Sequence, residues 1–199
     1  MTITPTAIPD VLMIAPCVSE DSRGYFVEAY SEQRYRDAGI VCPFVQDNES
    51  CSMKGVLRGL HYQVPPYAQA KLVRVIRGAV LDVVVDIRKG SPTFGQYVTA
   101  HISAENKRQL FIPHGFAHGF LVLEDNTIFS YKCDNYYSPQ HEHGIRWDDP
   151  AINIRWPQLD VPFVLSEKDK RQPLLAEADL FDNVAAASLP PTTQKETEK

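Results

Sequence analysis

One nine-residue stretch of the chain, residues 79–87, alternates strictly between two kinds of position. All of its odd positions are apolar, whereas Asp82 and Asp86 stand at even positions. A period of two places the two sets on opposite faces of a β-strand, so this stretch predicts a strand with one wholly apolar face. Residues 72–76 are also largely apolar and β-branched, and they end at Arg77-Gly78. This ending predicts a hairpin between the two strands.

Other parts of the chain have the same strand character. Seven further stretches are rich in β-branched or aromatic residues and are separated by turn residues: 25–30, 44–50, 56–62, 96–102, 109–112, 117–123 and 127–133. Most of the 15 prolines lie between apolar runs. Strands that recur this often predict an all-β sandwich or barrel.

Helical signals are few and short. Residues 31–39 read as a helix that begins at Ser31 as N-cap and ends at Gly39. A second helix begins at Ser166-Glu-Lys-Asp169, a capping signature, and must end by Pro173. We expect one domain over residues 1–183, followed by a disordered tail over residues 184–199 that lacks apolar periodicity.

The charge balance excludes some classes of function. The chain has 20 Lys and Arg against 25 Asp and Glu, a net charge of −5. Proteins that track nucleic acid or an anionic membrane usually need a basic excess, so we expect neither partner. No run approaches the roughly 18 apolar residues of a membrane span, and no secretory signal opens the chain. Four scattered cysteines without a C-x-x-C pair favour a reduced, cytoplasmic setting.

The richest segment for chemistry runs from Arg58 to Arg74. It places His61 near several cations, among them Lys71. Histidine is the usual general base at neutral pH, and fixed cations beside it stabilise an oxyanion or hold a phosphate. The alternative is that the arginines pair with surface carboxylates and His61 packs in the core. In a regular strand Arg58 and His61 face opposite sides, so a shared pocket needs a bulge, which Gly59 permits.

Two further histidines, His114 and His118, follow closely in the chain. With His61 they offer three imidazoles, and histidine ligands hold metals in many small barrels. The spacing of His114 and His118, four residues apart across Gly115, and the lack of an H-x-H or H-E-x-x-H motif among these three histidines favour no metal site. His114 receives no role from the sequence.

Tyr131 and Asp169 complete the set of candidates. A strand tyrosine is either a core residue with its hydroxyl at the rim or an acid beside cations. Asp169 is either the third residue of the helix opened by Ser166, where the dipole favours it, or a hydrogen-bond acceptor that orients His61. One side chain fills both roles only if that helix end closes over the barrel mouth.

Eight short blocks stand in one order along the chain. They are DSRGYFVE (21–28), FVQDN (44–48), VLRGLHYQ (56–63), KLVR (71–74), VDIR (85–88), SPTFG (91–95), FIPHGFAHGF (111–120) and NYYSP (135–139). In this order the chain resembles the dTDP-4-dehydrorhamnose 3,5-epimerase family, except in its tail. The order is far more specific than any single block.

The resemblance implies a cupin-like jelly-roll, usually dimeric, that works without a metal ion or organic cofactor. It implies the substrate dTDP-4-dehydro-6-deoxy-D-glucose, epimerised at C3 and C5 to dTDP-4-dehydro-L-rhamnose on the route to dTDP-L-rhamnose. By position His61 resembles the family's general base and Tyr131 its proton donor. Asp169 resembles the partner of His61, and Lys71 the cation that faces the keto oxygen.

The resemblance also implies a binding site for the nucleotide sugar. Positions similar to those that contact sugar, diphosphate or thymidine are Arg23, Glu28, Gln46, Asn48, Arg58, His118, Glu142 and Lys168. Phe26 and Tyr137 are aromatic residues suited to stack on thymine. The segment with Arg23, Phe26 and Glu28 is expected to reach across a homodimer, which makes each site composite.

Three alternatives remain open at this stage. A 3-epimerase that inverts only C3 of a related dTDP-4-keto sugar uses the same residues. A sugar-nucleotide-binding module without catalysis, or a metal-dependent cupin oxygenase, belongs to a different class.

Overall fold

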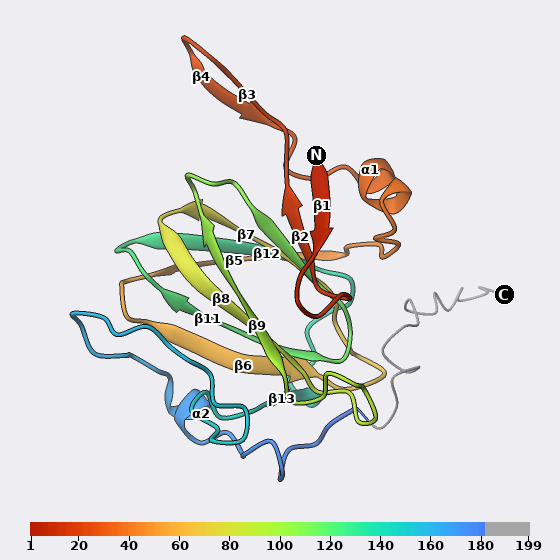
Figure 1. The fold of residues 1–199 in the computed structure, drawn as a ribbon, viewed down its shortest axis with the longest axis vertical. Helices are drawn as coiled ribbons and strands as arrows, with labels where there is room; N and C mark the ends of the chain where they lie inside the picture. The colour runs from red at the N-terminus through yellow and green to blue at the C-terminus, as the bar shows by residue number, and fades with distance from the viewer. Residues whose placement is uncertain (182–199) are drawn as a thin grey trace, which may run out of the picture.

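The computed structural model of the chain describes residues 1–181, and it consists almost entirely of β-strands (Figure 1). The predicted tail over residues 184–199 lies outside the described residues. No helix within residues 1–181 is long and apolar enough to cross a membrane.

Two antiparallel sheets and one separate hairpin contain all the named strands. The larger sheet has the spatial order β1 (Thr2–Pro5), β2 (Leu12–Ala15), β10 (Gln109–Ile112), β7 (Lys71–Arg77), β12 (Thr127–Cys133) and β5 (Gln46–Ser52). The smaller sheet has the order β13 (Glu142–Gly144), β6 (Leu57–Gln63), β11 (Phe116–Val122), β8 (Ala79–Asp86) and β9 (Tyr97–Ser103). The hairpin pairs β3 (Val18–Asp21) with β4 (Gly24–Val27). The prediction of an all-β, cupin-like jelly-roll is confirmed.

The two sheets pack face to face around an apolar core. Residues such as Val84 on β8 and Phe129 on β12 meet there. A second cluster buries the other face of the smaller sheet, where Val83 and Val85 of β8 pack against residues near the end of the chain such as Leu175. Both faces of β8 are therefore covered, and the face that carries Asp82 is the one between the sheets.

The predicted hairpin between residues 72–76 and 79–87 is wrong. β7 pairs with β10 and β12 in the larger sheet, whereas β8 pairs with β9 and β11 in the smaller one. Only Gly78 separates the two strands, which is shorter than the two-residue loop of a tight hairpin. Gly78 has a φ of +79°, and a Cβ there would lie 2.2 Å from Oγ1 of Thr127. The chain uses this glycine to pass from one sheet to the other.

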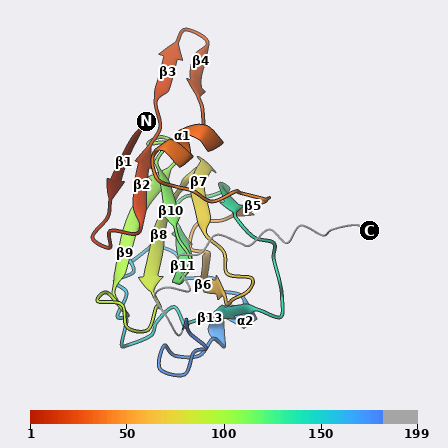
Figure 2. The same ribbon diagram turned by 90° about the vertical axis from the view of Figure 1, so that its right-hand side faces the viewer.

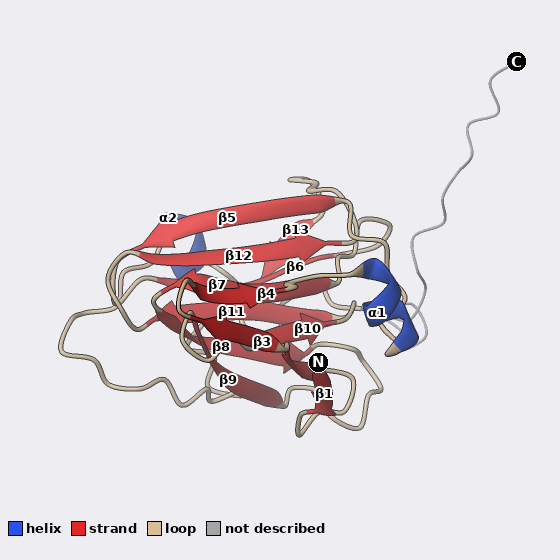
Figure 3. Cartoon of the chain, turned by 90° about the horizontal axis from the view of Figure 1, so that it is seen from above, coloured by secondary structure: helices blue, strands red, loops and turns tan. Residues whose placement is uncertain are grey.

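The two short helices lie on opposite sides of the strands (Figure 3). In α1 (Glu32–Asp37) the N-cap is Ser31 as predicted, but its side chain makes no capping hydrogen bond. In α2 (Glu167–Lys170) the predicted cap is confirmed, because Oγ of Ser166 accepts a hydrogen bond from the backbone N–H of Asp169 at 3.1 Å. α2 contacts β6, which brings Asp169 close to the strand that carries His61.

The hairpin of β3 and β4 projects away from both sheets (Figures 1 and 2). The ammonium of Lys107 lies 3.8 Å from the ring centroid of Tyr25 on β4. Phe26, the next residue, is 73% exposed. The hairpin therefore presents a large apolar side chain to the surroundings of the protomer.

Candidate active site

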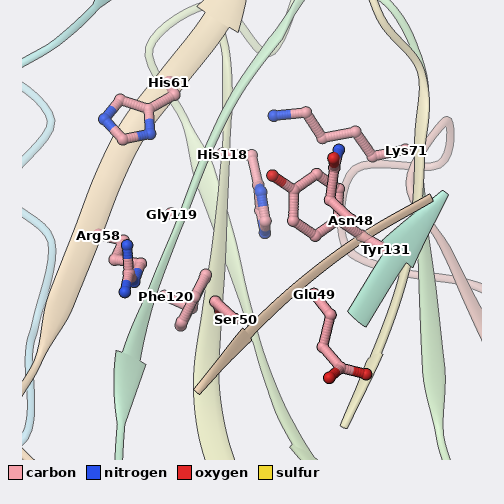
Figure 4. Close-up of a pocket in the computed structure, with 10 residues that line it drawn as sticks. All are labelled: Asn48, Glu49, Ser50, Arg58, His61, Lys71, His118, Gly119, Phe120 and Tyr131. Atoms are coloured by element: carbon pink, nitrogen blue, oxygen red, sulfur yellow. The ribbon is translucent and has the colours of Figure 1, made fainter. Parts of the chain in front are cut away.

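A cavity of about 300 Å³ lies between the two sheets. It is bordered by residues of five strands, β5, β6, β7, β11 and β12 (Figure 4). The residues that line it are Asn48, Glu49, Ser50, Arg58, His61, Lys71, His118, Gly119, Phe120 and Tyr131. Six of the residues predicted from the sequence therefore share one cavity.

A smaller hollow of about 80 Å³ adjoins this cavity. The two share the lining residues Asn48, His61, Lys71 and Tyr131. The smaller hollow adds three more of the predicted residues, Gln46, Tyr137 and Glu142. The arrangement is one site with a wide part and a narrow part.

His61 is held by a carboxylate from a distant part of the chain. Nε2 of His61 lies 2.6 Å from Oδ1 of Asp169, whose side chain is only 4% exposed. Burial alone would raise the pKa of Asp169, but the hydrogen bonds with His61 and Ser166 outweigh it and hold that pKa below its ordinary value. Asp169 thus stands at the third position of α2 and binds His61 at the same time.

A register shift in β6 allows Arg58 and His61 to line the same cavity. His118 of β11 stands opposite His61, and Phe120 stands opposite Arg58, so one residue fewer separates the pair on β11 than on β6. Gly59 lies inside this irregularity with a φ of +128°, and a Cβ there would come within 2.6 Å of Cα of Gly119. A glycine is required at this bulge because of both its backbone conformation and its close neighbour.

Lys71 and Tyr131 come from the sheet that faces His61. Figure 4 shows His61 at one side of the cavity and these two residues at the other. The ammonium of Lys71 lies 5.9 Å from the ring centroid of Tyr131. Burial lowers the pKa of Lys71 and raises that of Tyr131, so the phenol is protonated at neutral pH. The site therefore holds an imidazole on one wall and a phenol and an amine on the other.

A second histidine–aspartate pair lies in the interior beside the first. Nε2 of His118 is 2.9 Å from Oδ2 of Asp82, and both residues are buried. Burial raises the pKa of Asp82, an effect that His118 and Lys71 oppose. Asp82 has no predicted role, because the alternation of residues 79–87 places it on the face opposite the wholly apolar one.

The two arginines of the segment from Arg58 to Arg74 lie in different places. Arg58 donates a hydrogen bond to Oγ of Ser52 at 3.1 Å, on the cavity side. Arg74 lines a separate hollow on the larger sheet together with Lys132, and does not line the cavity. Neither Arg58 nor Arg74 forms an ion pair with a carboxylate of residues 1–181.

The narrow part of the site contains a hydrogen-bonded group around Glu142. The hydroxyl of Tyr137 donates to this carboxylate at 2.6 Å, and the ammonium of Lys168 also binds it. Burial would raise the pKa of Glu142, but these two hydrogen bonds outweigh it and hold the pKa low. The same bond raises the pKa of Tyr137 to about 12. Tyr137 is 52% exposed, so its ring is open to a ligand at the mouth.

Three predicted residues are not brought to the cavity of their own protomer. Arg23 lies in the turn of the projecting hairpin and pairs with Asp21, and Phe26 lies on β4. Glu28 follows β4 and pairs with Arg34 at 3.3 Å. None of the three lines either hollow.

The three histidines do not form a common ligand set. His114 binds a third aspartate, Asp134, with its Nε2 2.8 Å from Oδ2, so each histidine is held by a different carboxylate. Residues 1–181 contain no group of three or more His, Cys, Asp or Glu arranged to hold a metal ion. The metal-dependent alternative therefore finds no ligand set in the described part of the chain.

Comparison with known proteins gives one consistent result. The family model of dTDP-4-dehydrorhamnose 3,5-epimerase matches residues 5–177. A dTDP-4-dehydrorhamnose 3,5-epimerase of Salmonella typhimurium is 55% identical over 183 residues, which cover 92% of this chain and 100% of that protein.

Solved structures are similar over the same region. A Legionella pneumophila dTDP-6-deoxy-D-glucose-3,5-epimerase in complex with dTDP-4-keto-L-rhamnose matches with a TM-score of 0.88 and 49% identity, over 91% of this chain and 97% of that one. A 3′-monoepimerase of Streptomyces bikiniensis in complex with dTDP-quinovose matches with a TM-score of 0.81 and 37% identity, over 86% and 87%. The chain belongs to the dTDP-4-dehydrorhamnose 3,5-epimerase family.

Proposed function

We propose that this chain epimerises dTDP-4-dehydro-6-deoxy-D-glucose at C3 and C5, giving dTDP-4-dehydro-L-rhamnose on the route to dTDP-L-rhamnose. The observation that carries the proposal is the placement of His61 on β6 of one sheet and of Lys71 and Tyr131 on β7 and β12 of the other, around one cavity. Inversion of a carbon needs a base and an acid on opposite faces of the ring, and this cavity provides both.

The chemistry follows from the ketone at C4. C3 and C5 both flank it, so each C–H bond becomes acidic when the carbonyl is polarised. His61 takes the proton, and the electron pair of the C–H bond moves into an enolate whose negative charge lies on the C4 oxygen. Asp169 accepts the N–H at Nε2 of His61, which leaves the other ring nitrogen free to act as the base.

Lys71 and Tyr131 complete the reaction. The ammonium of Lys71 stabilises the enolate oxygen, because a fixed cation in a buried site needs no reorganisation when charge develops. Tyr131 then donates its proton to the carbon from the opposite face. Proton exchange with water restores the imidazole and the phenol, so the cycle consumes no oxidant, metal or organic cofactor. The same residues serve C3 and C5 in turn.

The nucleotide part is assigned to the mouth of the site. Arg58 and Lys168 supply positive charge for the diphosphate, and the exposed ring of Tyr137 offers a face for thymine. The dTDP-sugar ligands of the related structures support a substrate of this class. Cytoplasmic location stays a prediction.

We assign Arg23, Phe26 and Glu28 to the site of a second copy of the chain. Their hairpin projects from the body and exposes 73% of Phe26, which supports a role outside its own protomer (Figure 1). A homodimer with two composite sites satisfies this geometry.

Proton NMR of the substrate with the protein in D₂O tests the function. Double epimerisation predicts deuterium at both C3 and C5. Deuterium at C3 alone supports the 3-epimerase instead, an alternative favoured by the structural similarity to the Streptomyces bikiniensis monoepimerase. Bound substrate without any exchange would leave a non-catalytic binding module.

The Tyr131→Phe variant separates the acid from the base. Deuterium exchange should persist in this variant, because His61 still removes and returns the proton on one face. Formation of the epimer should slow by about 10²-fold or more, since the opposite face lacks its donor. Unchanged epimerisation would remove Tyr131 from this role.

Mixing two inactive variants tests the composite site. In a mixed dimer of His61→Ala and Phe26→Ala, one of the two sites retains both native residues. Activity should therefore return on mixing if Phe26 serves the second copy. Two variants that stay inactive after mixing, although they exchange subunits, would place Phe26 in the site of its own protomer and contradict the composite site.

A further inference from the structure

A single atom within residues 1–181 breaks the rule that buried polar groups find partners. Oδ1 of Asp82 is the one buried side-chain oxygen or nitrogen in this region that makes no hydrogen bond. Asp82 is fully buried on β8, between the two sheets. An unpaired carboxylate oxygen in such a place is costly, so its retention calls for a compensating charge nearby.

The other oxygen of Asp82 is held by His118. Nε2 of His118 lies 2.9 Å from Oδ2, and a carboxylate there accepts the N–H of that nitrogen. Nδ1 of His118 has no hydrogen-bond partner among residues 1–181, and the ring lines the cavity. Burial lowers the pKa of His118, so the imidazole is neutral and does not compensate the charge of Asp82.

Lys71 is a cation without a paired carboxylate among residues 1–181. It lies in the cavity and makes no ion pair within 4.0 Å with any carboxylate of residues 1–181. The titratable groups that face it are Tyr131 and Cys133 on β12, Glu142 on β13, His61 on β6, His118 on β11 and Asp82 on β8.

Most of these groups supply no free negative charge. Burial raises the pKa of the Cys133 thiol to about 11 and also raises that of Tyr131, so both are neutral at pH 7. Glu142 is already bound by Lys168 and by the hydroxyl of Tyr137. Asp82 remains as the one carboxylate facing Lys71 that no other cation within residues 1–181 neutralises.

We propose that Asp82 is a positioning residue of the epimerase, whose carboxylate, anchored by His118, is the buried counter-charge that keeps Lys71 in its ammonium form. The proposal rests on the proposed function, because the ammonium is the group that faces the enolate oxygen. Asp82 does not touch the substrate and acts through Lys71.

The sign of the effect follows from charge. Removal of the carboxylate removes an attraction that favours the ammonium, so the pKa of Lys71 falls further below its ordinary value. The alkaline limb of the pH profile of kcat should then move to lower pH. We expect a shift of about one pH unit, the usual effect of a single nearby opposite charge.

The experiment compares kcat against pH for the native protein, Asp82→Asn and Asp86→Asn. Asp86 is an equally buried aspartate of the same strand, but it binds Arg88 and Ser91 outside the cavity. The alkaline limb should move in Asp82→Asn only, and activity should recover as the pH is lowered. An unmoved limb in Asp82→Asn, or an equal shift in both variants, overturns the proposal.

A measurement without turnover separates this proposal from the proposed function. The ¹³Cε resonance of Lys71 in the free protein, assigned by its loss in Lys71→Ala, reports the protonation of the amine directly. Its titration midpoint should fall by about one unit in Asp82→Asn. This result stands whether or not the chain epimerises the sugar, and an unchanged midpoint contradicts the proposal.

A second variant covers the case in which Asp82→Asn does not fold. Lys71→Met removes the cation. If the charges are coupled, the pKa of His118 in the pair of His118 and Asp82 should change in return. Because Lys71 lowers the pKa of His118, the ring resonances of His118 should titrate at higher pH in Lys71→Met. A His118 titration that does not move shows that the charges are not coupled.

Discussion

Two histidine–aspartate pairs stand side by side, with their histidines on neighbouring strands, and they differ in their access to water. His61 on β6 is the register partner of His118 on β11. The side chain of His61 is 27% exposed, whereas that of His118 is 7% exposed. Their aspartates respond in opposite ways, because the pKa of Asp169 is lowered and that of Asp82 is raised.

This difference shows how one pair of residue types serves two purposes. A partly exposed imidazole with a stabilised carboxylate behind it can exchange protons with a ligand and with water. A sealed pair pays a desolvation cost for each charge and is suited to a fixed electrostatic role. Solvent access, rather than residue identity, separates the proposed base, His61, from His118.

The largest effect should come from replacing His61, and a matched replacement of His118 provides the comparison. His61→Ala removes the proposed base and should lower the rate of deuterium exchange at both carbons by about 10³-fold or more. His118→Asn should lower it by only about tenfold, since the ring contributes a hydrogen bond and not the proton transfer. NMR in D₂O measures both. An equal loss of exchange rate in the two variants would contradict the proposed difference between the two histidine–aspartate pairs.

Lys71 should have the next largest effect. Lys71→Met keeps the length of the side chain but removes the cation at the enolate oxygen, and kcat should fall by about 10²–10³-fold. Binding of dTDP should change little, because the amine is assigned to the sugar and not to the nucleotide. Calorimetric titration with dTDP provides the control. A loss confined to binding, with kcat intact, would contradict this assignment.

The fold was predictable where periodicity is strong. Residues 79–87 and 127–133 appear in the structure as β8 and β12. The four-residue strands β1, β2 and β3 and the three-residue β13 were not predicted, because such short segments carry little pattern; β10, of the same length, was predicted as residues 109–112. The hairpin expected at Gly78 failed for a different reason. Local sequence predicts a turn but does not show which sheet the next strand joins.

The sequence predicted six of the residues that line the cavity and Asp169 as the partner of His61, but not the pairing of His118 with Asp82. His61, Lys71 and Tyr131 lie far apart in the chain and meet only because two sheets face each other. Asp82 was visible as a polar position in β8, yet the alternation indicated a solvent-facing side. The residues near the end of the chain that bury the apolar face of β8, such as Leu175, turn the face with Asp82 into the interior. Such tertiary coverage is not encoded in a local pattern.

Asp169 and Asp82 should contribute to the free energy of unfolding with opposite dependence on pH. The folded pKa of Asp169 is depressed, so its contribution is present above its ordinary value of 3.8 and is lost as the pH falls through the folded pKa. The folded pKa of Asp82 is raised, so its contribution is present below 3.8 and is lost as the pH rises through the folded pKa.

Urea unfolding between about pH 3 and pH 7 measures this difference. The destabilisation caused by Asp169→Asn should grow with pH and reach about 2 kcal/mol, the value of a hydrogen bond to a charged group. The destabilisation caused by Asp82→Asn should shrink over the same range. Parallel slopes would show that the two carboxylates experience the same environment.

The third pair, His114 and Asp134, should give the smallest effect on activity. It is as well sealed as the pair of His118, since the two side chains are 9% and 1% exposed, but it does not line the cavity. Oδ1 of Asp134 accepts a hydrogen bond from the backbone N–H of Ala70 at 2.7 Å, so the pair ties the end of β12 to the start of β7. His114→Asn should lower the free energy of unfolding by about 1–3 kcal/mol, the cost of a lost buried partner.

The same variant should leave kcat within about threefold of the native value, because no group in the cavity changes. A much larger loss of kcat would carry a specific meaning. Ala70 directly precedes Lys71, so a drop comparable with that of Lys71→Met would show that the third pair also positions the amine. Sealed pairs would then share one function in this protein, which is to hold Lys71, and the partly exposed pair would remain distinct in transferring protons.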